Sequence, residues 1–374
     1  MNRQITNKIK KLGWAEIKLS NESITKLNEL IFFSESIYQI KKNDNYNIDS
    51  LENDIREAST KTILRYSDQS KIFVKSLIKD LVKYNPYIKD FYLTPPYIIT
   101  HLPKELLEKG DYHSDKLKYC GKLYTSWTPI NNYQMDYPAL SIINKSHSYY
   151  LKIIFKLLNK IRLSNNFNKV LKILLIKPLD LIVKKNFTYL WIGDLIHKGN
   201  CNKTNKKHSA LVVRISEKPL YYEPTVKISD ILNNSDFTNN LKKISVDDLS
   251  STISKICNVA KNKSDLIEYA CNLKDTLDKN ILKHVSFSLS LLAQKFENRF
   301  HSNLDLISFI LAKENLVSLE RYLTKFKDED ISKKIINRFF VDTNLSYQES
   351  LIIKKFKNQN FNDINHQKKI EWLE

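Results

Sequence analysis

Proline and glycine are confined almost entirely to the middle of this chain. All nine prolines lie between Pro86 and Pro224, and four of the five glycines lie in the same stretch. Both residue types favour turns, and turns concentrate where many short strands must be joined. The flanks have no proline and a single glycine, Gly13. The distribution therefore predicts a β-rich middle between two mainly helical flanks.

Five short runs in the middle stretch are rich in β-branched and aromatic residues, as strands are. They cover residues 91–102, 122–128, 139–143, 187–192 and 210–215. In the flanks, apolar residues recur at helical spacing, and the pattern after Pro224 is helical to the end. We therefore expect an α+β protein in two parts. Residues 1–230 form the first domain, with a helical flank (1–85) and a β core (86–225), and residues 231–374 form an α-helical extension.

The formal net charge of the 374 residues is +19. Such an excess favours anionic partners, but lysine and asparagine are used heavily along the whole chain, and no tight basic block with interleaved aromatic residues occurs. We therefore expect no nucleic-acid partner. No run of about 18 uncharged apolar residues occurs, so no transmembrane helix is expected. Peripheral contact with a membrane surface stays open.

The four cysteines form no CxxC pair and show no regular spacing. This pattern argues against a disulfide framework or a zinc site and fits a reducing compartment. The N-terminus is basic but is followed by no apolar segment of a secretory signal. We therefore expect a cytoplasmic protein, and the sequence leaves its oligomeric state undetermined.

One short motif carries chemistry: His113-Ser114-Asp115. With 8 histidines and 41 acidic residues, about one His-x-acid triplet is expected by chance, so the motif alone says little. In an extended strand, however, residues i and i+2 point to the same face, and His113 and Asp115 would then project together.

A second histidine completes the set. His197 follows the strand-like run at 187–192, a glycine turn and an apolar dipeptide. Two imidazoles and one carboxylate on one side of a metal form the ligand set of non-haem Fe(II) oxygenases. Further along, Arg214 and Ser216 share a face of the run at 210–215. An arginine with a hydroxyl two residues later suits bidentate capture of a carboxylate.

The segment from about residue 97 to 216 resembles the phytanoyl-CoA dioxygenase family of Fe(II)/2-oxoglutarate oxygenases. The resemblance rests on DYHSDKLKYCGKLYTSWTPINNYQMDYPALSIINKSHSYY and YLWIGDLIHKGNCNKTNKKHSALVVRIS. After the HxD motif, the family has a Trp-x-Pro-like turn, an Ala-Leu strand and a Gly-Ser-His-like turn. These are matched here by residues 127–129, 138–140 and 145–147, and the family's polar loop after the distal histidine is matched by 199–204.

The resemblance implies a double-stranded β-helix (jelly-roll, cupin-like) core that uses Fe(II), 2-oxoglutarate and O2. His113, Asp115 and His197 correspond to the iron ligands, and Arg214 corresponds to the arginine that holds the distal carboxylate of 2-oxoglutarate. Here the chain departs from the family, whose arginine usually lies closer to the distal histidine, where this chain has Lys207 and His208. Arg214 is the first choice, and Lys207 or His208 is the alternative.

The implied activity is hydroxylation of a small organic substrate with release of succinate and CO2. The excess of lysine suits an anionic substrate, such as a sugar, lipid or acyl conjugate. The alternative is a catalytically silent jelly-roll used as a binding or scaffold module, with the helical extension as its interaction surface. A third interpretation, a basic protein whose HxD motif is accidental, conflicts with the ordered markers between His113 and His197.

Several further residues have two interpretations. His101 contacts 2-oxoglutarate or is a plain wall residue, and Thr125 is a further candidate for co-substrate binding. Tyr112 and Asn202 are open candidates for pocket lining. His147 is expected to be structural. The tryptophans Trp127 and Trp191 are expected to be core and pocket walls rather than platforms for a substrate.

Overall fold

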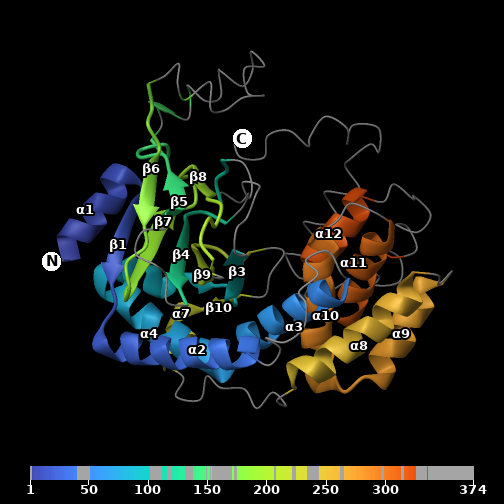
Figure 1. Ribbon diagram of the computed structural model, residues 1–374. Coiled ribbons are helices and arrows are strands. Elements are labelled where there is room, and N and C mark those ends of the chain that lie inside the picture. The colour runs from blue at the N-terminus through green and yellow to red at the C-terminus, as the bar shows by residue number, and fades with distance from the viewer. Residues whose placement is uncertain are drawn as a thin grey trace.

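The computed structural model describes residues 2–39, 51–101, 112–115, 120–130, 138–148, 150, 151, 153, 171, 175–205, 208–220, 225–233, 244–261, 265–295, 299–312, 316–325 and 335. Within these ranges the chain is an α+β protein with two antiparallel sheets and helices at both ends of the sequence (Figure 1). The fold class expected from the proline and glycine distribution is thus confirmed at this level.

The larger sheet has seven described strands in the order β1-β7-β4-β9-β2-β10, with β3 also paired to β9. Every pairing is antiparallel. Its long central strand is β9, which lies between β4 on one side and β2 and β3 on the other. The strands are β1 (Trp14–Lys18), β2 (Tyr92–Leu93), β3 (Tyr97–His101), β4 (Leu123–Pro129), β7 (Phe187–Ile192), β9 (His208–Ser216) and β10 (Val226–Lys227).

The smaller sheet has three described strands: β5 (Pro138–Ile142), β6 (Leu179–Ile182) and β8 (His197–Gly199), in the order β6-β5-β8. One apolar cluster joins the two sheets, because it contains Trp127, Tyr189 and Val212 of the larger sheet and Leu140 and Leu181 of the smaller one. The sheets therefore share a core. A double-stranded β-helix is consistent with this pairing and stays a prediction.

Helices cover the opposite face of the larger sheet. They are α1 (Asn2–Leu12), α2 (Asn21–Gln39), α4 (Asp68–Tyr84), the 3-10 helix η1 (Pro86–Asp90) and α7 (Ile228–Asn233). A second apolar cluster combines Leu30 of α2 and Leu77 of α4 with Leu211, Val213 and Ile215 of β9. Alternate residues of β9 therefore pack against the helices on one face and against the smaller sheet on the other, as strand geometry requires.

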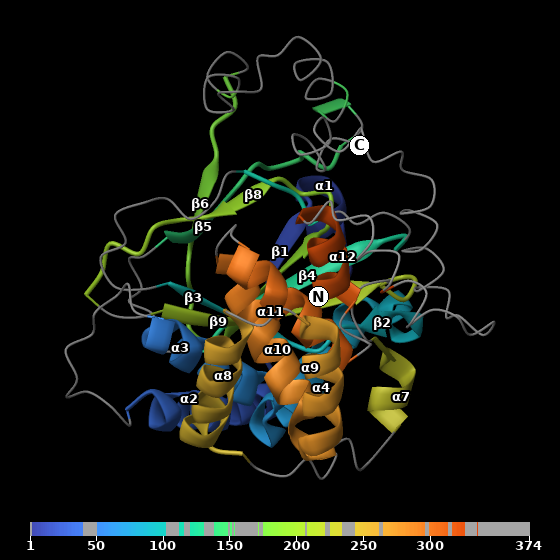
Figure 2. The same cartoon turned by 90° about the vertical axis from the view of Figure 1, so that its right-hand side faces the viewer.

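The C-terminal helices form a further cluster with α3 (Leu51–Tyr66), which lies beside α8 and α10 (Figures 1 and 2). They are α8 (Val246–Ala260), α9 (Leu266–Thr276), α10 (Lys279–Lys295), α11 (Arg299–Leu311) and α12 (Leu316–Lys325). The helices expected after Pro224 are present among the described residues, but the expectation of helix alone is wrong, because β10 (Val226–Lys227) is a short strand paired with β2. Residues 326–334 and 336–374 lie outside the described residues. The domain boundary near residue 230 stays a prediction, and α3 packs against helices from beyond it.

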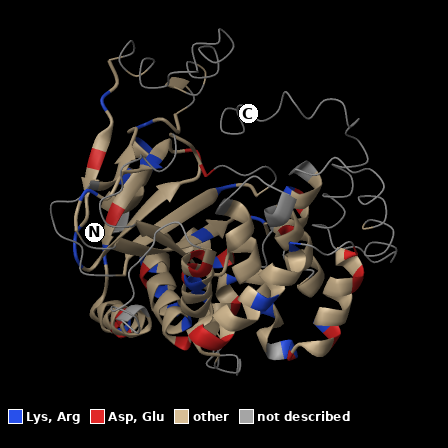
Figure 3. Cartoon of the chain, turned by 45° about the vertical axis from the view of Figure 1, so that its right-hand side comes forward, with Lys and Arg blue, Asp and Glu red and all other residues tan. Residues whose placement is uncertain are grey.

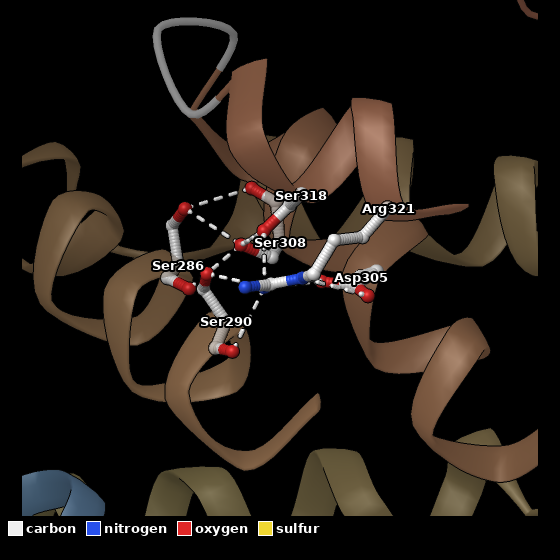
Figure 4. A network of polar contacts seen from close by, with 6 residues as sticks. All are labelled: Ser286, Ser290, Asp305, Ser308, Ser318 and Arg321. Carbon is white, nitrogen blue, oxygen red and sulfur yellow. Dashed lines mark hydrogen bonds and ion pairs between the residues drawn. The ribbon is translucent and has the colours of Figure 1, made fainter. Parts of the chain in front are cut away.

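A buried polar network crosses three of these helices (Figure 4). Arg321 of α12 forms an ion pair with Asp305 of α11, with its Nη2 2.6 Å from Oδ1. The same Nη2 donates to the hydroxyl and the carbonyl oxygen of Ser290 on α10, at 2.7 and 2.9 Å. Asp305 is fully buried, so the network ties α10, α11 and α12 together through a charge that has no contact with water.

Two local expectations need correction. The N-terminal flank is mainly helical, but it also contains β1, a five-residue edge strand paired with β7. So short a run carries too little periodicity to be recognised without its partner. The run at 91–102 is interrupted at Pro95 and Pro96 and forms two strands, β2 and β3, because proline cannot donate a ladder hydrogen bond.

Charge is dispersed over the helices. In the view of Figure 3, basic and acidic residues are interspersed on the described helices, which agrees with the interpretation that the net charge reflects composition. Among the described residues, none of the helices has the length and apolar character needed to cross a membrane.

Candidate metal centre

The backbone brings His113 and His197 together. The two residues form a β-bridge in which each amide N–H donates to the other's carbonyl oxygen, both at 2.9 Å. Their imidazole centroids lie 4.5 Å apart. Sequence reasoning expected a regular strand at the HxD motif. That strand was expected to project His113 and Asp115 to one face. Within residues 112–115 the structure has a single bridge instead, and this bridge places His113 beside His197.

Asp115 completes the cluster. One donor atom from each of His113, Asp115 and His197 lies within 4.8 Å of the other two, and the described residues contain one such group. The distance between Nε2 of His197 and Oδ2 of Asp115 is 3.7 Å. Asp115 and His197 are buried, whereas His113 is exposed. Two imidazole nitrogens and one carboxylate oxygen suit an Fe(II)-type ion with further positions open.

The carboxylate of Asp115 is held by two donors from the larger sheet. The Thr125 hydroxyl on β4 donates to Oδ2 at 2.8 Å, and the Trp191 indole N–H on β7 donates to the same oxygen at 3.0 Å. Thr125 and Trp191 are opposite each other in the β4–β7 register. The sheet pairing therefore fixes the orientation of the carboxylate before any ion binds.

His197 is oriented from both sides of its ring. Its Nδ1 lies 3.0 Å from the carbonyl oxygen of Leu195, so Nδ1 carries the proton and Nε2 is left as the ligand atom on the side of Asp115. The Trp191 indole packs against the imidazole with centroids 4.9 Å apart. A metal-binding histidine needs this kind of support to hold its tautomer and ring orientation.

The electrostatics of the cluster favour the protonation states that bind metal. Burial would raise the pKa of Asp115, but the electrostatic interactions with His197 and Arg214 and the hydrogen bond from Thr125 outweigh it and hold this pKa well below its usual range. Burial lowers the pKa of His197, although Asp115 opposes the shift. Metal ligands must be deprotonated, so an ionised Asp115 and a neutral His197 are ready to coordinate.

Arg214 lies next to the cluster. It is opposite Thr125 in the β4–β9 register, and its Nη2 is 3.4 Å from Oδ1 of Asp115. Its guanidinium carbon lies 5.2 Å from the centre of the Tyr97 ring. The arginine selected from the sequence therefore contacts a candidate metal ligand directly, and it lies within reach of an anion bound beside Asp115.

The other predicted binding residues face the same side of the larger sheet. Ala210 and Val212 of β9 pack between the sheets, so His208, Arg214 and Ser216 point to that side as well. Ser216 is fully buried at the end of β9. Thr125 also faces this side, where it contacts Asp115 and thus serves the candidate ligand.

His101 lies at the opposite end of β9 from Arg214. It is the register partner of His208, and both side chains are buried. The Asn202 amide donates to the His101 carbonyl at 3.2 Å, and the Thr204 hydroxyl lies 2.8 Å from Nε2 of His208. Asn202 thus ties the polar loop after His197 to β3. Lys207 lies outside the described residues.

The turn that contains His147 contacts the segment that carries His197. The Ser146 hydroxyl accepts the N–H of Ile196 at 2.8 Å, and Nε2 of His147 lies 3.1 Å from the carbonyl of Lys10. Gly13 has a φ of +89°, and a Cβ there would lie 2.5 Å from Nδ1 of His147. These contacts agree with a structural role for His147.

Trp191 is the residue whose role the sequence interpretation missed. It was expected to be a wall, yet it contacts both Asp115 and His197. The two-residue alternation of β7 puts Trp191 on the same face as Tyr189, which belongs to the core between the sheets. This alternation was the available signal, but it could not show that Asp115 lies opposite.

We expect Trp191→Phe to weaken binding of a divalent metal by roughly 10–100-fold, the usual effect of removing a partner of a metal ligand. The phenyl ring keeps the apolar contact and loses the N–H donor. The measurement is a competition titration with Fe(II) or Ni(II). Trp14→Phe is the matched control: Trp14 is opposite Trp191 in the β1–β7 register, and its indole donates to Asn144 at 2.7 Å. An equal loss in both variants would contradict a specific role for Trp191.

No protein-family model matches the sequence, and no curated protein matches it. Solved structures are similar at a low level. AviO1 from Streptomyces viridochromogenes Tue57 is 11% identical, with a TM-score of 0.39 over 60% of this chain and 98% of that chain. SnoN, described as a non-heme alpha ketoglutarate dependent epimerase from nogalamycin biosynthesis, is 7% identical, with a TM-score of 0.34 over 57% of this chain and 81% of that one.

A nickel complex of ThoJ, described as a non-heme monooxygenase, is 8% identical, with a TM-score of 0.37 over 68% of this chain and 97% of that chain. Similarities of this size leave the function to be argued from the cluster of His113, Asp115 and His197.

Proposed function

We propose that the chain is an Fe(II)- and 2-oxoglutarate-dependent oxygenase that hydroxylates a small organic substrate. The observation that carries the proposal is the convergence of His113, Asp115 and His197, whose donor atoms lie within 4.8 Å of one another. Two imidazoles and one carboxylate that leave positions open suit Fe(II), and the open positions distinguish the site from structural zinc sites, which four ligands close.

When bound, the iron would supply the activation of O2 and the decarboxylation of 2-oxoglutarate to succinate. The chain's own residues position the reactants. Thr125 and Trp191 hold the Asp115 carboxylate, and the Leu195 carbonyl holds the His197 ring. The exposure of His113 marks the side from which a co-substrate and a substrate reach the centre. Asp115 and His197 are buried, so the protein interior shields these two side chains from water.

Arg214 supplies a positive charge for the co-substrate. Its Nη2 faces Asp115, and a guanidinium presents five N–H donors in a planar fork that matches a carboxylate. A dicarboxylic keto acid at the iron would therefore have Arg214 on the Asp115 side. His208 lies on the same face further along β9 and is the alternative. The substrate is proposed to be a small, anionic molecule such as a sugar, lipid or acyl conjugate, as the excess of lysine suggests.

The test is turnover by the purified chain. Metal-free protein is loaded anaerobically with Fe(II) and 2-oxoglutarate, and succinate and CO2 are measured after O2 is admitted. Stoichiometric release of both, with stabilisation by metal and co-substrate before O2 is added, is the expected result. If metal and co-substrate stabilise the protein but no succinate is released, the non-catalytic binding module is favoured. If there is neither stabilisation nor succinate, the proposed metal-dependent function is contradicted.

We expect Arg214→Ala to raise the 2-oxoglutarate concentration needed for half-maximal stabilisation of the Fe(II)-loaded protein, because a charged hydrogen bond to the carboxylate is lost. A loss of about 2 kcal/mol corresponds to roughly 30-fold weaker binding. The comparison is His208→Ala, measured by calorimetry in the same buffer. If His208→Ala weakens binding and Arg214→Ala does not, the distal carboxylate belongs to His208.

A further inference from the structure

Among the described residues, Arg65 is a buried charge that lies outside the metal centre. This residue lies near the C-terminal end of α3 and is 3% exposed. Its guanidinium carbon lies 3.9 Å from the centre of the Phe287 ring on α10 and 5.7 Å from that of Tyr66. The guanidinium therefore sits in the seam where α3 packs against α10.

The guanidinium of Arg65 has no polar partner among the described residues. Its Nε and Nη1 are buried and form no hydrogen bond, and no acidic group of the described chain lies within ion-pair distance of it. Arg321 shows the contrast in the same helical region: it is also largely buried, but it pairs with Asp305 and two serines. Among the described residues, one buried arginine is thus paired and the other has no counter-charge.

Buried donors without a partner are costly, because Nε and Nη1 of Arg65 lose their hydration and gain no acceptor in return. Stacking on Phe287 and Tyr66 offsets part of this cost. It cannot satisfy the N–H donors, which lie in the plane of the group rather than on its face. The free energy of this arrangement falls if an acceptor enters the seam and meets the edge of the guanidinium.

The seam offers no acid of its own for this purpose. The α10 segment from Lys279 to Lys295 contains no aspartate or glutamate, and it contributes the buried His284, whose ring centroid lies 4.9 Å from that of Tyr66. On α3 the acidic residues lie in its N-terminal half, and Glu57 is paired with Lys61. The local chemistry is therefore basic and aromatic, with hydroxyls from Thr62 and Ser288 nearby on the same two helices.

We propose that the α3–α10 seam binds a small oxyanion, a phosphate or carboxylate group, through the edge of the Arg65 guanidinium. The planar fork matches two oxygens of such a group. The site is separate from the metal centre, because Arg65 lies on the helices that pack with the C-terminal extension. The bound group would join α3 to α10 and would make the helical extension responsive to the concentration of an anionic metabolite.

The experiment measures the thermal stability of the full, metal-free chain against inorganic phosphate, and separately against acetate, with ionic strength held constant by sodium chloride. At about ten times the dissociation constant we expect a rise in Tm of about 2 °C. Arg65→Met should lose this rise. Arg56→Met, on the same helix, should keep it, since Arg56 is paired at the surface with Asp247. A response to phosphate alone identifies a phosphate group, and a response to both identifies any small oxyanion.

The proposal fails if neither anion raises the Tm of the wild type, or if Arg65→Met responds as the wild type does. Should Arg65→Met not fold, hydrogen exchange on the wild type decides the matter. Phosphate or acetate should then slow exchange in residues 62–66 and 284–288. Slowing elsewhere in the described chain, with these segments unchanged, overturns the site at Arg65 and assigns the anion to another place.

Discussion

Asp115→Asn is expected to abolish metal-dependent turnover of 2-oxoglutarate. The amide keeps the shape of the side chain, and its oxygen can still accept hydrogen bonds from Thr125 and Trp191. The negative charge that faces His197 and Arg214 is lost. Loss of a ligand should exceed the roughly 10–100-fold effect of losing a ligand's partner. The measurements are Fe(II) affinity by competition titration and succinate release after O2 is admitted.

The control for this substitution is Asp194→Asn. Asp194 lies in the turn between β7 and β8, close along the chain to His197 but outside the metal cluster. This variant should bind metal and release succinate as the wild type does. If Asp115→Asn releases succinate at the wild-type rate, the assignment of the metal centre is contradicted, whatever Asp194→Asn does.

Arg321→Met is expected to lower the free energy of unfolding by about 3–5 kcal/mol, because it leaves a buried aspartate without its counter-charge. Asp305 is fully buried, and its carboxylate accepts from both Nε and Nη2 of Arg321. The serines of the network cannot replace this charge (Figure 4). The measurement is the shift of the urea midpoint followed by circular dichroism.

Two further variants separate this effect from ordinary loss of an ion pair. Arg56→Met breaks the pair with Asp247, whose side chain is 62% exposed, and should cost no more than about 1 kcal/mol. The double variant Asp305→Leu/Arg321→Met removes both charges and should recover most of the stability. If the double variant is as unstable as Arg321→Met, the network contributes through its packing and serine hydrogen bonds rather than through the buried charge.

The strand runs were predictable because each has its own local composition. The run at 187–192 is β7 without any shift, and the runs at 122–128 and 210–215 are β4 and β9 with shifts of one or two residues at their ends. Their two-sided burial follows from alternation, with Leu211 and Val213 facing the helices and Ala210 and Val212 facing the other sheet. By contrast, the five residues of β1 are too few to show a recognisable strand pattern in the sequence. They form a strand because they pair with β7.

The candidate site was predictable in part, and for a similar reason. The HxD motif and the turn before His197 are local patterns, so His113, Asp115 and His197 could be selected from the sequence. The supporting contacts could not, because they join residues far apart in the chain. Trp191 reaches Asp115 across the core between the sheets, and no spacing along the sequence encodes which side chain will lie opposite another.

The sequence by itself determined the α+β class, the β-rich middle and the three candidate ligands, since these follow from turn residues, strand alternation and a short motif. Only the tertiary structure decided that Thr125 and Trp191 hold Asp115, that Arg214 contacts this carboxylate, and that Arg65 is buried against α10 while Arg321 is paired. The physical reason is common to all of them. The free energy of a buried polar group depends on its neighbours in space, and those neighbours are set by how sheets and helices pack.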